Sequence, residues 1–201
     1  MANGRWLSVR NSFLLFITLT VLIVFFRVYY SGIKFKSDIA DKQKLSSGDI
    51  IFRKGTSFWS PFFSTLNSQT GYSHVGVIVK DRGELYVIHS DSDDLAINGG
   101  VQKTILNQFI EESSLVKFMN NKMTPDVKNK FLKNIGYSLE KKVPFDDDFD
   151  IHDNGEKLYC TELLWRSALN SGGKLGDVEI IAGKELITVD SIYSSDVLSN
   201  F

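Results

Sequence analysis

The chain has 201 residues, of which 43% are hydrophobic and 23% are charged, so it can bury a core and is neither disordered nor fibrous. Its single cysteine excludes a disulfide framework and a multi-cysteine zinc site. The net charge of −1 gives no basis for nucleic-acid binding. Residues 1–36 carry five basic groups and no acid, whereas residues 37–201 carry 18 basic and 24 acidic groups. We therefore predict two parts in different surroundings.

The N-terminal part is strongly apolar. Residues 11–26 are uncharged and as a helix would span roughly 24 Å, somewhat less than a hydrocarbon core of about 30 Å. The span becomes long enough if the Arg27 side chain snorkels to the membrane surface and residues 28–30 extend into the interface. A cleaved signal peptide is the rival interpretation, but residues 27–34 offer little resemblance to a cleavage site. A buried core helix is a third. We predict a membrane anchor over residues 1–36, with the transmembrane helix at about 11–30 and the following domain on the extracytoplasmic side of the membrane.

Residues 37–201 show the alternating apolar patterns of strands and the 3.6-residue spacing of helices. A hairpin is predicted where residues 81–84 join two β-branched runs. Thr124 and Pro125 begin a helix as N-cap and first helical residue, and two glycines after residue 171 end another. An α+β fold with a small antiparallel sheet packed against helices follows. The predicted strands are 49–53, 75–80, 85–89, 115–119, 178–182 and 186–189, and the predicted helices are 101–112, 124–139 and 160–169.

Three residues could carry nucleophilic chemistry. Cys160 lies at a predicted helix N-terminus, where free N–H groups and the helix dipole lower a thiol pKa and can bind an oxyanion. His74 begins the first hairpin strand and His89 ends the second, so the two fall nearly opposite each other. One strand pair could thus present a base and the group that orients it.

Other interpretations remain open from these residues alone. Cys160 could be a buried small hydrophobe, and the two histidines could be ordinary surface or core residues. The acidic segment 144–156 could bind calcium, although its acids do not follow the EF-hand order. His74, His89 and Cys160 could together bind zinc.

Several motifs, in this order, resemble those of the permuted papain-like cysteine amidases of the YiiX/YaeF/YebB group. They are L-S-S-G-D-I-I-F, Y-S-H-V-G-V-I-V, L-Y-V-I-H, V-P-F-D-D-D-F and L-Y-C-T-E-L-L-W. These enzymes are relatives of the NlpC-type cell-wall peptidases and of lecithin–retinol acyltransferase. The resemblance covers about residues 45–200 and implies a permuted papain-like (NlpC-type) fold.

The resemblance also implies roles for individual residues. Cys160 is the nucleophile, His74 is the general base, and His89 is the third polar residue, a position that is often Glu in the bacterial members. Tyr159, directly before the nucleophile, and Tyr72 are expected to line the substrate or oxyanion subsite.

The sequence therefore predicts a single-pass, membrane-anchored cysteine hydrolase that acts on an amide such as a cell-wall peptide, without a metal or cofactor. A lipid acyltransferase or thioesterase is the first alternative, because the membrane anchor and the aromatic residues 58–63 would suit an acyl-lipid substrate. A non-catalytic domain that binds peptide or lipid on the same fold is the second.

Overall fold

A computed structural model describes residues 20–22, 42, 44–55, 69–92 and 99–201. The chain separates into two compact units, residues 1–44 and residues 45–201. In the first unit, residues 20–22 are helical and the side chains of Val21 and Leu22 are exposed. Among the described residues, no helix combines the length and the apolar character needed to cross a bilayer. The predicted transmembrane helix is therefore not supported here; apart from residues 20–22, its residues 11–30 lie outside the described ones.

The second unit is built on a six-stranded antiparallel sheet with the order β4-β3-β2-β1-β5-β8. The predicted hairpin is confirmed as β2 and β3, joined by a two-residue turn. Arg82 (φ 49°) and Gly83 (φ 88°) occupy the left-handed region that such tight hairpin turns require. The strands are β1 (Ile50–Gly55), β2 (His74–Asp81), β3 (Glu84–Asp91), β4 (Gly100–Ile105), β5 (Ser113–Asn121) and β8 (Leu198–Ser199).

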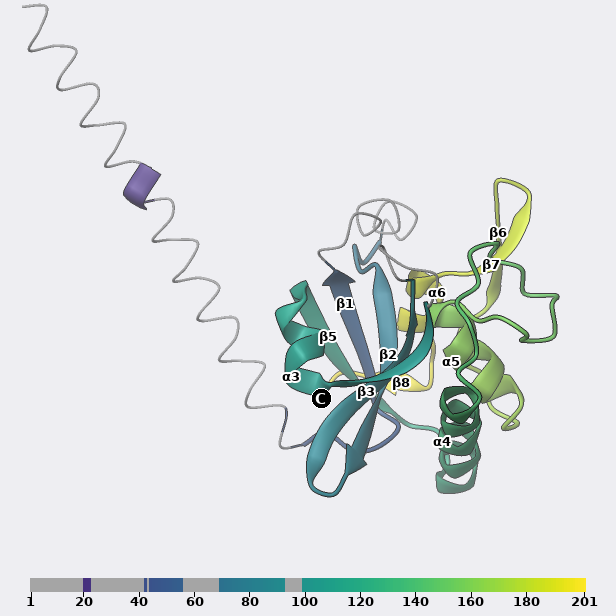
Figure 1. Cartoon of the computed structure of the whole chain (residues 1–201), viewed down its shortest axis with the longest axis horizontal. Helices are drawn as coiled ribbons and strands as arrows, with labels where there is room; N and C mark the ends of the chain where they lie inside the picture. Colours follow the sequence, from purple (N-terminus) through teal and green to yellow (C-terminus); the bar gives the residue numbers. More distant parts are fainter. Residues whose placement is uncertain (1–19, 23–41, 43, 56–68, 93–98) are drawn as a thin grey trace, which may run out of the picture. The chain divides into compact units, whose positions relative to one another are not determined.

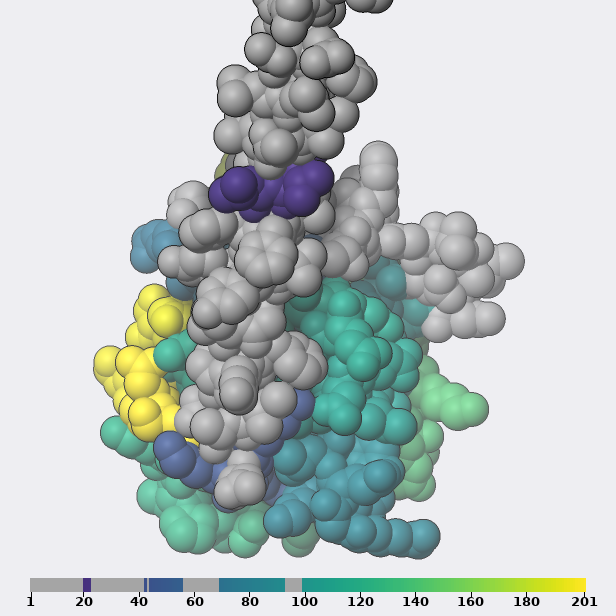
Figure 2. All heavy atoms as spheres, turned by 90° about the vertical axis from the view of Figure 1, so that its left-hand side faces the viewer, coloured from purple at the N-terminus to yellow at the C-terminus, as the bar shows by residue number. Residues whose placement is uncertain are grey.

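Helices cover both faces of this sheet, with α3 on one side and α4 and α5 on the other (Figure 1). The space-filling view in Figure 2 shows the α3 side, where α3 (teal) lies above the β2–β3 hairpin (blue). Because both faces of the sheet are covered, the sequences of β1 and β2 contain continuous apolar segments instead of alternating apolar and polar residues. The helices are α3 (Leu106–Glu111), α4 (Pro125–Glu140), α5 (Cys160–Leu169) and α6 (Val189–Tyr193), and a separate hairpin joins β6 (Val178–Ile181) to β7 (Lys184–Ile187).

Two core clusters follow from the two covered faces. Val75 and Val77 of β2 pack with α4 and α5, whereas Ile78 packs with Val87 and with Phe109 of α3. Side chains on a strand alternate between faces. Each strand of the hairpin therefore contributes residues to both clusters.

The predicted helix over residues 101–112 is half wrong. Residues 101–105 form strand β4, which pairs with β3, and only residues 106–111 are helical. Val101, Ile105, Leu106 and Phe109 recur at nearly helical spacing, but the free edge of β3 offers a full set of backbone partners. Pairing at that edge outweighs the local preference.

Candidate active site

The two hairpin histidines contact each other directly. His74 Nε2 lies 2.9 Å from His89 Nδ1, and the two rings meet edge to face at 5.0 Å between centroids. Strand register pairs Val77 with Ile88, so His89 lies beside Gly76 and reaches His74 diagonally rather than from the opposite position that the sequence suggested. Gly76 makes this possible, because a Cβ there would lie only 3.2 Å from the His89 Cβ.

Further contacts fix the His89 ring. Its second nitrogen, Nε2, bonds to Thr104 Oγ1 of β4 at 2.9 Å. Phe109 of α3 packs edge to face on His89 at 5.0 Å and also contacts the His74 ring at 5.8 Å. Both histidines are buried. The pair is thus held by two elements besides its own two strands, β4 and α3.

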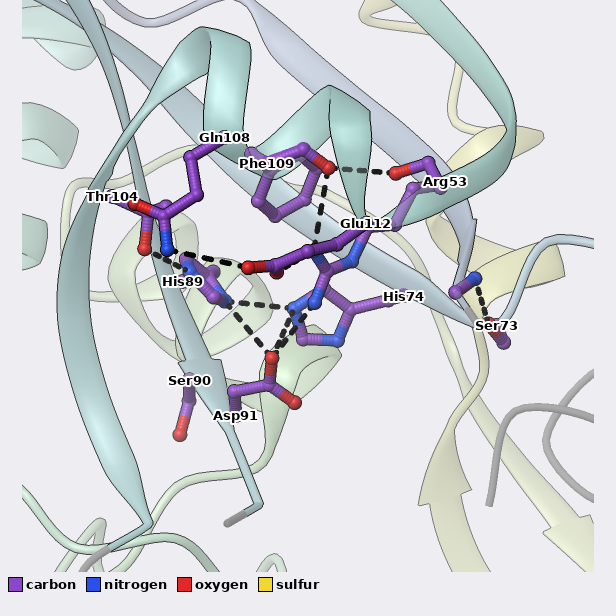
Figure 3. Close-up of polar contacts among 12 residues, drawn as sticks. Arg53, Ser73, His74, His89, Ser90, Asp91, Thr104, Gln108, Phe109 and Glu112 are labelled. Atoms are coloured by element: carbon purple, nitrogen blue, oxygen red, sulfur yellow. Dashed lines mark hydrogen bonds and ion pairs between the residues drawn. The ribbon is translucent and has the colours of Figure 1, made fainter. Parts of the chain in front are cut away.

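Arg53 and Asp91 form a charged group beside the histidines (Figure 3). Asp91 Oδ2 is 2.8 Å from the Arg53 guanidinium, 3.7 Å from His89 Nδ1 and 4.0 Å from His74 Nε2. Arg53 also binds Glu112 at 3.1 Å and lies 4.1 Å over the Phe109 ring. The ligand atoms of His74, His89 and Asp91 all lie within 4.8 Å of one another, so this group could hold a metal ion.

The surroundings keep both imidazoles neutral. Burial, followed by the Arg53 charge, holds the pKa of His74 well below 6.5. Burial and the neighbouring His74 likewise lower the pKa of His89, and Asp91 opposes that shift only in part. A neutral imidazole has one free nitrogen lone pair, so each ring can accept a proton at neutral pH.

Cys160 is the first residue of α5, as predicted, but its thiol is not acidified. Burial raises the pKa of Cys160 to about 12, and the nearby Asp91 adds to the rise. Hydrogen bonding from the backbone N–H groups of Val75 and Thr161 opposes the shift without cancelling it. The prediction that the helix N-terminus lowers this pKa is therefore wrong, because desolvation of the thiolate outweighs the helix dipole.

The Cys160 thiol contacts the backbone of strand β2. Within the described part of the chain, no hydrogen bond joins the Cys160 sulfur to His74 or His89. The sulfur lies at the backbone N–H of Val75, the residue after His74, and α5 packs against β2 and β3. In enzymes without substrate, catalytic hydrogen bonds are often long and tighten only on binding.

The two tyrosines predicted to line the substrate site are buried. Tyr159 is 4% exposed and its hydroxyl accepts a 2.9 Å hydrogen bond from the Ile187 N–H. Burial raises its pKa. Tyr72 is 8% exposed and stacks on Tyr193. Both therefore pack in the core beside the site, and their lining of the substrate or oxyanion subsite stays a prediction.

Sequence reasoning missed the residues around the histidines. Asp91 follows His89 by two residues on the same strand face, so it could have been noticed once His89 was singled out. Arg53 and Thr104 come from other strands, and only the sheet order brings them near. No sequence signal identified them.

Glu162 was also missed, although it lies two residues after Cys160. Its side chain is fully buried, and Arg166 binds Oε1 at 2.6 Å. The other oxygen, Oε2, has no hydrogen-bond partner among the described residues. Burial raises the pKa of Glu162 to about 7. Arg166 also donates to the carbonyl of Ile151, so this arginine links Glu162 in the first turn of α5 to the loop that carries Ile151.

Comparison with known families gives the assignment. Residues 44–197 match the permuted papain-like amidase enzyme family YaeF/YiiX, C92. The chain belongs to this family. The match covers nearly the whole second unit, so the resemblance seen in the motifs holds for the folded domain. The family is named for amidase activity. No curated protein matches the chain significantly.

A solved structure supports the fold. The chain is similar to the crystal structure of metalloprotein yiiX from Escherichia coli O157:H7, DUF1105, with a TM-score of 0.64 and 20% identity. The similarity covers 77% of this chain and 94% of the other. The permuted papain-like α+β fold with its antiparallel sheet is thereby confirmed.

Proposed function

We propose that this family member is a cysteine amidase in which Cys160 attacks the substrate carbonyl, His74 is the general base and His89 orients it. The observation that carries the proposal is the 2.9 Å contact between His74 Nε2 and His89 Nδ1. With Nε2 engaged, Nδ1 is the nitrogen of His74 that remains for the thiol. Two observations favour this pairing: the Cys160 sulfur lies at the N–H of Val75, the residue after His74, and the Asp91 charge acts on the thiol and lies 4.0 Å from His74 Nε2.

A chain of hydrogen bonds sets the proton positions. If His89 Nε2–H donates to Thr104, then His89 Nδ1 carries a lone pair and accepts from His74 Nε2–H. His74 Nδ1 then carries the lone pair that a base needs. This is the orienting role that a third residue performs in nucleophilic catalysis.

The reaction proceeds by acyl transfer. As the Cys160 sulfur bonds to the carbonyl carbon, its proton passes to His74 Nδ1. His74 returns that proton to the departing amine when the C–N bond breaks. Water then attacks the thioester, giving its proton to His74, and releases the acid and the free thiol. Because the resting thiol and imidazole are both neutral, proton transfer accompanies attack rather than preceding it.

Two features would stabilise the charges that develop. The backbone N–H groups at the start of α5 are free of helical partners and can bind the oxyanion. Asp91, 4.0 Å from His74 Nε2, lies near enough to favour the imidazolium that forms during attack.

We further propose a peptide amide, such as that of cell-wall peptide, as the substrate. The family name favours an amide over a lipid ester. The aromatic residues 58–63, on which the acyl-lipid alternative depends, lie outside the described residues. Membrane anchoring through residues 11–30, with residues 37–201 on the extracytoplasmic side, belongs to the same proposal and rests on the apolar sequence alone.

The test is hydrolysis by the full-length protein of matched peptide amides and acyl esters. We expect amide hydrolysis that is abolished in Cys160→Ala and in His74→Ala. His152 provides the matched control, because it is the third histidine, is exposed and pairs with Glu185 on the surface. His152→Ala should retain full activity. Ester hydrolysis without amide hydrolysis would favour the acyltransferase alternative, and activity that survives in Cys160→Ala would overturn cysteine catalysis.

A further inference from the structure

Three potential metal ligands face one another at the histidine pair. His74 Nε2, His89 Nδ1 and Asp91 Oδ2 are separated by 2.9, 3.7 and 4.0 Å and form a triangle that Figure 3 shows as dashed lines. A point equidistant from three atoms at these separations lies about 2.1 Å from each, which is the length of a Zn–N or Zn–O bond. Two imidazoles and a carboxylate form a donor set that suits zinc.

Neighbouring residues complete such a site. Thr104 Oγ1 lies 2.9 Å from His89 Nε2 and fixes the ring; when Nε2–H donates to it, Nδ1 carries the lone pair that a ligand requires. Asp91 Oδ2 accepts from Arg53 but, as a carboxylate oxygen, has a second lone pair. Arg53 places a positive charge nearby, yet Asp91 and Glu112 both pair with it, so the group has a net charge of −1 before a cation binds.

We propose that His74, His89 and Asp91 bind a divalent zinc-like ion and that the occupied site holds the enzyme inactive. The inhibitory half rests on the proposed function. A metal on His74 Nε2 moves that nitrogen's proton to Nδ1, with no net proton gained or lost. Nδ1 then has no lone pair to accept the Cys160 proton, so the thiol loses its base.

Binding can be measured without any turnover. Zinc chloride is titrated into the full-length protein in competition with a chromophoric chelator. We expect one ion per chain in the wild type and in Cys160→Ala. His89→Gln and Asp91→Asn should each weaken binding about tenfold or more, since each removes one ligand while keeping a hydrogen-bonding group. Circular dichroism checks that both variants are folded.

His152→Gln is the control, because His152 is an exposed histidine that pairs with Glu185 on the surface and is not one of the three ligands. It should retain zinc affinity within about twofold of the wild type. The metal site is overturned if Cys160→Ala abolishes binding, or if the folded Asp91→Asn and His89→Gln variants bind zinc as tightly as the wild type.

Inhibition is measured on the same preparations. Zinc should suppress amide hydrolysis by the wild type, and a chelator should restore it. Activation by zinc would overturn the inhibitory half. If no amide is hydrolysed with or without chelator, the proposed function and the inhibitory half both fail, whereas the zinc affinities still decide whether the site exists.

Discussion

The absence of a side chain at Gly76 allows strands β2 and β3 to approach closely enough for His74 to contact His89. Replacing Gly76 by alanine tests this dependence. A Cβ at Gly76 would lie 2.4 Å from Val87 Cγ1, and 3.2 Å from both His89 Cβ and the Ile88 carbonyl oxygen. The first distance is far below van der Waals contact, and Val87 is fully buried in the core. The strands must therefore separate locally, which moves His89 away from His74.

Overpacking a buried site by one methyl group costs about 1–3 kcal/mol. In a domain of this size, a loss of about 2 kcal/mol lowers Tm by roughly 4–8 °C. We expect Gly76→Ala to show this decrease by calorimetry, together with a lower kcat. Gly136→Ala is the control: Gly136 lies inside α4 with no atom within 4 Å of the added Cβ, so that substitution should stabilise by about 0.5–1 kcal/mol.

The double variant Gly76→Ala with Val87→Ala identifies the cause. Val87→Ala alone should cost about 2 kcal/mol through the cavity it leaves. If the 2.4 Å contact is the source of strain, the double variant is less destabilised than the sum of the two singles by about 1 kcal/mol or more. Strict additivity, or a Gly76→Ala protein with unchanged Tm and kcat, would show that this contact neither strains the strands nor sets the histidine pair.

Three further predictions concern the charges at the site. Because its pKa is raised, Cys160 of the resting enzyme should react with iodoacetamide at pH 8 more slowly than free cysteine does; equal or faster reaction would show an acidified thiol. Because the folded protein holds both buried histidines neutral, their contribution to stability should be complete above pH 6.5 and should be lost as the pH falls below that value. In thermal melts between pH 7 and pH 5, the decrease in Tm should be smaller for His89→Gln than for the wild type. His152→Gln should show the same decrease in Tm as the wild type. Arg53→Gln should lower the free energy of unfolding, measured in urea, by about 3 kcal/mol; this is the low end for a broken buried ion pair, because both carboxylate partners of Arg53 are partly exposed. Loss of the Arg53 charge should also raise the pKa of His74, so the acidic limb of the kcat/KM profile should move to higher pH. If that limb stays in place, Arg53 does not control the pKa of His74.

The parts of the fold that sequence patterns predicted are those where local and tertiary preferences agree. The β2–β3 hairpin has both β-branched strands and a turn residue suited to positive φ, and α4 begins with Thr124 and Pro125. Residues 101–105 failed because their partner, the edge of β3, comes from elsewhere in the chain. Helix α6 was missed, since its five residues are too few to establish a helical period.

The candidate site was predicted as far as residue type and strand position allow. His74, His89 and Cys160 were found because each lies at the end of an element that the sequence defines. The thiol pKa was predicted with the wrong sign, since a helix N-terminus can be seen in a sequence but desolvation by packed neighbours cannot. Arg53 and Asp91 required the sheet order.

If Cys160 is a nucleophile assisted by His74, the reaction must pass through an acyl-enzyme that can be detected. The full-length protein is mixed with a p-nitrophenyl ester of an N-acylated amino acid, and nitrophenolate release is followed together with the intact mass. We expect a burst of about one equivalent, an acyl adduct on Cys160, and a burst rate lowered roughly 10²–10⁴-fold in His74→Ala. An adduct on another residue, or a burst rate indifferent to His74, would contradict this mechanism.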